Sequence, residues 1–147
     1  MPRIVLFQPE IAANFGNILR SCACFGARLS VIEPLGFPLA AKDVRRAAMD
    51  YGRDVDLTRH ATWDTYIQDH AAARRVLFTT QGATPLGDFV FDAGDHLVFG
   101  RESAGVPEAV HASAAHRVVI PLAAGARSLN LSNTVAIALF EALRQTG

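Results

Sequence analysis

A chain of 147 residues is long enough to bury one hydrophobic core, and by the usual length of domains residues 1–147 form a single domain. Half of the residues are hydrophobic and 19% are charged, which argues against a disordered chain. Fourteen basic and fourteen acidic residues cancel, so net charge gives no sign of a nucleic-acid-binding protein. No apolar run is long enough for a membrane span and the start lacks a signal peptide's layout, so we expect a cytoplasmic protein.

The basic residues are almost all arginine, since Lys42 is the only lysine. Arginine suits bidentate recognition of phosphate better than lysine does. A bias in codon usage explains most of these arginines equally well. Cys22 and Cys24 lie two positions apart on a predicted helix and point to different faces, which suits neither a disulfide nor a zinc site.

Segments typical of strands and helices alternate along the chain. Strands are predicted at 3–7, 29–32, 55–58, 76–79, 97–99 and 118–120, and helices at 14–25, 42–49, 63–71, 107–114 and from about 131 to 145. Gly26 ends the first helix, and Pro107 suits the first turn of the fourth. This alternation predicts an α/β fold, an open and mostly parallel sheet with helices on both faces.

The last helix carries more apolar surface than one core requires. Its first apolar face comprises Leu131, Val135, Ala138, Leu139, Ala142 and Leu143. Ser132 or Asn133 is expected to cap its start. Ala136, Ile137 and Phe140 form a second apolar stripe, so we expect the helix to contact both the core and a second subunit.

Polar or glycine-rich loops follow three of the predicted strands, where ligands bind in parallel sheets. These loops are residues 78–82, 99–105 and 120–130, and a fourth polar cluster at residues 14–20 opens the first helix. None of them has the Gly-x-Gly-x-x-Gly or P-loop pattern, so a conventional dinucleotide or NTP site is disfavoured.

Three of these segments, in this order, resemble the motifs of the SPOUT superfamily of knotted RNA methyltransferases. The first is Asn14-x-Gly16-Asn17-x-x-Arg20, and the second is the segment 97–107. The third combines Ile120-Pro121 with the segment 128–133. Each motif alone is weak, but the ordered set within one short chain is specific.

Within that superfamily the sequence is most similar to the small tRNA (cytidine/uridine-2′-O)-methyltransferases that modify the wobble nucleotide, position 34. Glu10, the segment 31–37 and the segment 42–51 carry this likeness, which runs from residue 3 to about 145. Gln81, Arg101 and Phe140 depart from residues common in that group. The resemblance implies a C-terminal trefoil knot and a homodimer in which the first and last helices pair between subunits. It also implies S-adenosylmethionine as cofactor, S-adenosylhomocysteine as product, tRNA as partner and no metal.

The resemblance implies a cofactor pocket lined by Phe78, Gly100, Ile120 and Ser128, the first three mainly through backbone groups. Glycine fits at position 100 because a side chain there would fill space that the cofactor needs. The alternative is a glycine that merely ends a strand.

Arg20 is the residue that the resemblance places at the centre of catalysis. Asn17 and Glu102 are expected beside it, with Ser128 and Asn130 opposite. A guanidinium whose pKa exceeds about 12 is a poor base, so we expect Arg20 to hold the target phosphate while the proton leaves through phosphate or water. A structural ion pair of Arg20 with Glu102 or Glu10 is the alternative.

Arg45 and Arg46 are the expected contacts to the RNA backbone, although a solvated helix face explains them too. Asn14 is expected to be a helix cap, and Asn133 simply to begin the last helix. Three other functions stay open: methylation of another tRNA or rRNA nucleotide, non-catalytic binding of nucleotide or RNA by a dimer, and a plain Rossmann-type module.

Overall fold

The computed structural model describes residues 1–81 and 84–147. Its strands are β1 (Arg3–Phe7), β2 (Arg28–Ile32), β3 (Leu57–His60), β4 (Arg75–Phe78), β5 (Thr84–Pro85), β6 (His96–Phe99) and β7 (His116–Val119). Its helices are α1 (Ala12–Phe25), α2 (Lys42–Ala48), α3 (Trp63–Asp69), α4 (Glu108–Ser113) and α5 (Leu131–Thr146), with short 3₁₀ turns η1 (Tyr51–Asp54) and η2 (Leu86–Asp88). Within the described part, no helix has the length and apolar character needed to span a membrane.

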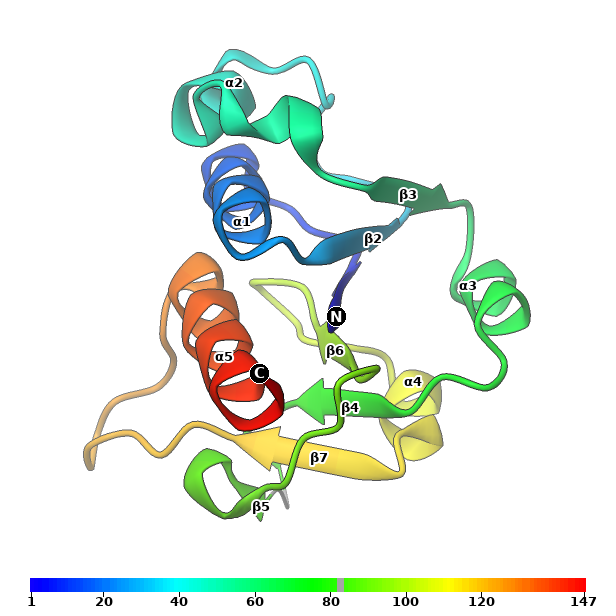
Figure 1. Ribbon diagram of the computed structural model, residues 1–147, viewed down its shortest axis with the longest axis vertical. Helices are drawn as coiled ribbons and strands as arrows, with labels where there is room; N and C mark the ends of the chain where they lie inside the picture. Colours follow the sequence, from blue (N-terminus) through cyan, green and yellow to red (C-terminus); the bar gives the residue numbers. More distant parts are fainter. Residues whose placement is uncertain (82–83) are drawn as a thin grey trace.

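All neighbouring strands pair in parallel, in the order β3-β2-β1-β6-β4-β7-β5. Helices α1, α2 and α5 cover one face of this sheet, and α3 and α4 cover the other (Figure 1). Alternate residues of β1 serve the two cores, because successive side chains of a strand point to opposite faces. Ile4 and Leu6 join the core under α1 and α5, while Val5 and Phe7 join the core under α3 and α4. The predicted α/β class, with helices on both faces, is confirmed.

The boundaries of most predicted elements are confirmed to within two residues. Helix α1 ends at Gly26, which has a φ of 68° and whose N–H reaches the carbonyl oxygens of Cys22 and Ala23. Strand β3 lies two residues later than predicted, because Val55 belongs to the turn after η1. The two-residue strand β5 was missed, since Thr84–Pro85 is exposed and carries no apolar pattern.

The prediction for α5 was right for its buried face and wrong for its cap. Val135, Ala138, Leu139 and Ala142 are buried, while Ile137 and Phe140 are 41% and 57% exposed. The side-chain oxygen of Asn130, rather than of Ser132 or Asn133, accepts a 2.9 Å hydrogen bond from the Ser132 amide. The helix therefore begins at Leu131, so that the polar residues 132–134 lie in its first turn.

A cluster of titratable side chains is buried between the sheet and α3. The Tyr66 hydroxyl and Nδ1 of His96 are 2.8 Å apart, and Arg3 donates a 3.0 Å hydrogen bond to the Ser30 hydroxyl. His60 lies 3.3 Å from the same hydroxyl, and its ring contacts that of Tyr66. Burial raises the pKa of Tyr66 to about 12. Burial therefore keeps the Tyr66 hydroxyl in its neutral form.

The stability of the fold should fall as the pH falls from about 6.5 to 4, because of His96. Burial, and then the neighbouring His70, Arg3 and Arg75, lower its pKa to about 4, whereas a histidine in an unfolded chain has a pKa of about 6.5. As the pH falls below about 6.5, the unfolded chain therefore binds the proton before the folded chain does. The contribution of His96 to the free energy of unfolding is complete above that pH and is lost towards pH 4. The shift corresponds to about 3 kcal/mol of unfolding free energy.

Urea unfolding at a series of pH values measures this dependence. Because carboxylates also titrate near pH 4, the informative quantity is the difference between the wild type and His96→Gln. We expect the variant to show a shallower slope between pH 6.5 and 4, and two parallel curves would contradict the assignment.

Candidate active site

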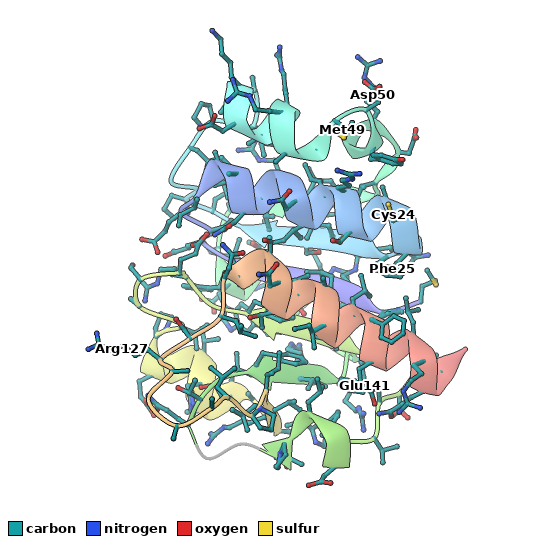
Figure 2. The ribbon with its side chains drawn as sticks, turned by 90° about the vertical axis from the view of Figure 1, so that its left-hand side faces the viewer. Cys24, Phe25, Met49, Asp50, Arg127 and Glu141 are labelled. Carbon is teal, nitrogen blue, oxygen red and sulfur yellow. The ribbon has the colours of Figure 1, made fainter. Side chains whose placement is uncertain are left out.

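A cavity of about 770 Å³ opens at the carboxyl ends of β4, β6 and β7. Its walls come from the loops that follow these three strands and from the start of α1 and α5. They comprise Ile11, Asn14, residues 78–81, 99–106, Glu108, His111, residues 118–120, Leu122, residues 127–131 and Thr134. This volume lies in the range of small-molecule sites. Arg127, on the loop before α5, extends outward at the rim (Figure 2).

All four residues predicted to bind the cofactor lie in the wall of this cavity: Phe78, Gly100, Ile120 and Ser128. The ring of Phe78 stacks on that of Phe99, with centroids 4.8 Å apart. Its side chain is thereby committed to packing, which leaves main-chain groups around it for a ligand. Ser128 is exposed, so its hydroxyl is accessible.

Gly100 is required for a reason that differs from the expected one. A Cβ at this position would lie 2.5 Å from the carbonyl carbon of Gly105 and 2.6 Å from its Cα. Residues 101 and 105 form an antiparallel bridge with two 2.9 Å backbone hydrogen bonds, closing a tight turn directly above Gly100. The protein's own backbone therefore requires the glycine, because the turn closes against it. The shape of the cavity depends on Gly100 only through this turn.

Glu102, at the centre of this turn, binds the residues that lead into α1. Its carboxylate accepts hydrogen bonds from the amides of Glu10 (2.9 Å) and Ile11 (3.2 Å) and from Nδ2 of Asn14 (3.5 Å). Ile11, the residue at the N-cap, has no side-chain acceptor of its own. A carboxylate beside unpaired first-turn amides also interacts favourably with the helix dipole. The loop after β6 and the start of α1 are therefore held together by Glu102.

Glu10 reinforces the same junction from the opposite side. Its carboxylate accepts hydrogen bonds from the amide of Ser103 (2.9 Å) and from its hydroxyl (2.8 Å). These bonds lower the pKa of the Glu10 carboxyl. Since both carboxylates are engaged this way, neither forms the ion pair with Arg20 that was the structural alternative; in the described part of the chain Arg20 forms none.

Asn14 joins the first and third motifs. It is buried within α1, so the prediction that it caps the helix was wrong. Its Oδ1 accepts a 2.9 Å hydrogen bond from Nδ2 of Asn130, whose own Oδ1 caps α5. Asn14 thus bridges Asn130 and Glu102, and all three motifs meet in one hydrogen-bond network. Sequence reasoning missed this role because a single asparagine near a helix start favours a cap.

Asn17 and Arg20 are the two predicted catalytic residues that do not join the described wall of their own chain's cavity. Both are exposed on the outer side of α1. Arg20 lies six residues beyond Asn14, about 9 Å further along the helix axis, and its guanidinium lies 5.5 Å from the centre of the Tyr51 ring. One chain brings together three of the predicted catalytic residues, Glu102, Ser128 and Asn130, in the cavity wall. Asn17 and Arg20 lie outside that wall.

The two predicted RNA contacts, Arg45 and Arg46, are exposed on α2. Helix α2 packs closely on α1, where a Cβ on Gly16 would lie 2.5 Å from the carbonyl oxygen of Val44. The glycine of the first motif therefore serves helix packing. No group of three or more His, Cys, Asp or Glu side chains is arranged to hold a metal within residues 1–81 and 84–147.

The cavity suits a ligand of nucleoside size that combines apolar and polar parts. Ile120 and Leu122 supply apolar surface, and the loop backbones around Phe78, Gly100 and Ser128 supply amide and carbonyl groups. Such a wall recognises a ligand by shape and main-chain hydrogen bonds, which is how an adenosine moiety can be held without a glycine-rich phosphate loop.

Known proteins are similar to this chain in sequence. Residues 1–140 match the SpoU rRNA Methylase family. A relative from Beijerinckia indica, named tRNA (cytidine(34)-2′-O)-methyltransferase, is 49% identical over 146 residues, covering 98% of this chain and 91% of its own. A relative of the same name from Burkholderia pseudomallei is 46% identical over 151 residues, covering 100% of this chain and 97% of its own.

Solved structures are similar to this chain in fold. One described as giving structural insights into the 2-OH methylation of C/U34 on tRNA has a TM-score of 0.94 and 40% identity, covering 99% of this chain and 95% of that one. An AdoMet-bound rRNA methyltransferase from Sinorhizobium meliloti has a TM-score of 0.89 and 26% identity, covering 97% of this chain and 56% of that one. Since the family match extends over most of its length and full-length relatives are nearly half identical, the chain belongs to the SpoU rRNA methylase family.

Proposed function

We propose that this protein is a tRNA 2′-O-methyltransferase that uses S-adenosylmethionine and acts on the ribose of nucleotide 34, a cytidine or a modified uridine. The observation that carries this proposal is the cavity at the ends of β4, β6 and β7, whose wall contains all four expected cofactor residues. The full-length likeness to relatives named for cytidine 34 supports the choice of nucleotide.

S-adenosylmethionine, when bound, supplies a methyl group on a positively charged sulfur that needs no metal to leave. Phe78, Gly100 and Ile120 hold the cofactor mainly through their backbones, and Ser128 offers its hydroxyl at the exposed side. Glu102 and Asn130 act on the reaction by fixing the loops, since their polar atoms are bonded to α1 and α5. Holding two reactants in line is the main contribution that a protein can make to such a displacement.

We propose that the protein is a homodimer and that Arg20 and Asn17 act on the cavity of the partner subunit. Helices α2, α1 and α5 lie side by side on one face (Figure 2). The rings of Phe25 and Phe140, both exposed, are 6.5 Å apart on this face, and Ile137 extends the apolar surface. A second copy covering α1 and α5 would bury these side chains and supply Arg20 from outside.

Arg45 and Arg46 are proposed to contact phosphates of the tRNA. Both project from the solvent side of α2, and neither is engaged in an ion pair in the described part of the chain. Contacts of this kind position an RNA without reading its sequence, so choice of nucleotide 34 has to come from the cavity region.

The C-terminal part is proposed to form a trefoil knot. Strands β4 and β5 follow each other along the chain, yet β7 lies between them and pairs with both. This order, in which β7 lies between two strands that precede it in the chain, supports the proposal. After β7 the chain continues into α5, where the Gln145 side chain accepts a hydrogen bond from the Phe91 amide and donates one to the Phe89 carbonyl of the loop that joins β4 to β6.

Mass-spectrometric nucleotide mapping of tRNA incubated with the protein and S-adenosylmethionine tests the function. We expect one added methyl group, on the ribose of nucleotide 34, and none on an otherwise identical tRNA with a 2′-deoxyribose there. A methyl group at another nucleotide would favour the alternative that the enzyme methylates a different position of tRNA or rRNA. Cofactor binding without transfer to any RNA would favour the non-catalytic binder.

A further inference from the structure

The segment 42–51 belongs to the sequence likeness, but the cavity leaves its last residue without a role. Tyr51 begins η1, the 3₁₀ turn that follows α2 and packs against α1. Its side chain is 44% exposed, and the guanidinium of Arg20 lies over its ring, 5.5 Å from the centroid. A tyrosine from a different element therefore contacts the residue proposed for catalysis.

The backbone fixes where this ring lies. The Met49 amide bonds to the Arg45 carbonyl oxygen at 2.9 Å, and Met49 has a φ of 54°, which turns the chain sharply from α2 into η1. Gly52 then lies against α1 and α2: a Cβ there would be in ordinary contact with Cδ1 of Leu19 at 3.6 Å and with Cβ of Ala48 at 3.5 Å. Tyr51 is thus held beside the outer side of α1 by main-chain geometry rather than by a flexible loop.

The Tyr51 ring lies against the Arg20 guanidinium, where no carboxylate of the described residues pairs with it. Glu10 and Glu102, the carboxylates expected to pair with it, are engaged by Ser103 and by the start of α1. An ion pair would occupy the N–H donors of the guanidinium, whereas a ring attracts the cation through its π face and leaves these donors for a phosphate. Stacking therefore restricts the long side chain while its hydrogen-bonding edge stays available.

We propose that Tyr51 is a positioning residue for methyl transfer, whose ring holds the Arg20 guanidinium ready to engage the phosphate of the target nucleotide. This inference rests on the proposed function. It assigns the segment 42–51 two tasks: Arg45 and Arg46 attract the RNA backbone, and Tyr51 aligns the catalytic arginine.

Single-turnover methylation of tRNA, at saturating cofactor, tests the proposal with Tyr51→Leu and Tyr51→Phe. An exposed cation–π contact justifies a loss of roughly twofold to fivefold in rate for Tyr51→Leu. Tyr51→Phe keeps the ring and should stay within about twofold of the wild type, because the hydroxyl is not required. Both variants should bind the cofactor with the affinity of the wild type, measured by calorimetry. They should also have its thermal unfolding temperature.

The outcomes separate this inference from the function on which it rests. An active wild type with an equally active Tyr51→Leu would overturn the positioning role alone. Equal losses in Tyr51→Leu and Tyr51→Phe would overturn it too, since they would point to the hydroxyl. A wild-type protein that binds the cofactor and methylates no tRNA would overturn both. The NMR signal of the Arg20 Nε proton gives an independent readout: it should shift in Tyr51→Leu and stay in place in Tyr51→Phe.

Discussion

Arg20→Ala is expected to lower the rate of tRNA methylation by roughly 10²–10³-fold, the usual cost of removing one group that stabilises charge in a transition state. The affinity for S-adenosylmethionine should stay within about twofold of the wild type, because Arg20 is proposed to engage the phosphate of the target nucleotide rather than the cofactor. Single-turnover assays with labelled cofactor measure the rate, and calorimetry measures the binding. A parallel loss of both would contradict the catalytic assignment.

A mixed dimer shows which subunit Arg20 serves. Arg20→Ala chains keep an intact cavity. Gly100→Val chains keep Arg20, but their added side chain clashes with the Gly105 backbone in the turn above the cavity. If Arg20 acts across the dimer, co-expressed chains should regain activity, because one of the two sites in each mixed dimer then combines both intact parts. Absence of recovery in confirmed mixed dimers would place Arg20 in its own chain's site.

Gly100→Ala is expected to destabilise the fold by about 1–3 kcal/mol, the usual cost of overpacking, and to weaken cofactor binding at least about tenfold. The added Cβ would meet the Gly105 backbone at 2.5 Å, so the turn of residues 101–105 has to move. Because Glu102 and Ser103 lie within that turn and bond to the start of α1, the cavity loses its connection to α1 as well. Urea unfolding and calorimetry measure the two effects.

Gly87→Ala is the matched control for this substitution. A Cβ on Gly87 would have no atom of the described structure within 4 Å. Its unfolding free energy should equal that of the wild type or rise by up to about 1 kcal/mol, because alanine reduces the freedom of the unfolded chain. Equal stabilities for Gly100→Ala and Gly87→Ala would show that the turn can relax around an extra methyl group.

The network around Asn14 changes how Glu102 and Asn130 should be understood. Glu102 was expected beside Arg20 and Asn130 opposite it, and their side chains hold the starts of α1 and α5. We propose that they serve the reaction as positioning residues, and Asn14 belongs with them because it bonds to both.

Local patterns in the sequence determined the elements and their classes. Apolar spacing located α5 and its buried face, Gly26 marked the end of α1, and the alternation of strands and helices predicted a parallel sheet. Parallel strands bring their carboxyl ends to one edge, so the sequence alone was enough to place the loops after β4, β6 and β7 together. These features depend on neighbours along the chain, which a sequence displays directly.

Only the tertiary structure decided what depends on contacts between distant residues. The bond from Asn130 to Asn14 joins residues 116 positions apart, and the clash that makes Gly100 a glycine comes from a turn whose shape no local pattern reveals. The insertion of β7 between β4 and β5 follows from strand order, which the apolar pattern of a strand does not encode. The position of Arg20 over Tyr51 is decided likewise, because packing of α2 and η1 on α1, rather than the sequence near Arg20, brings the two side chains together.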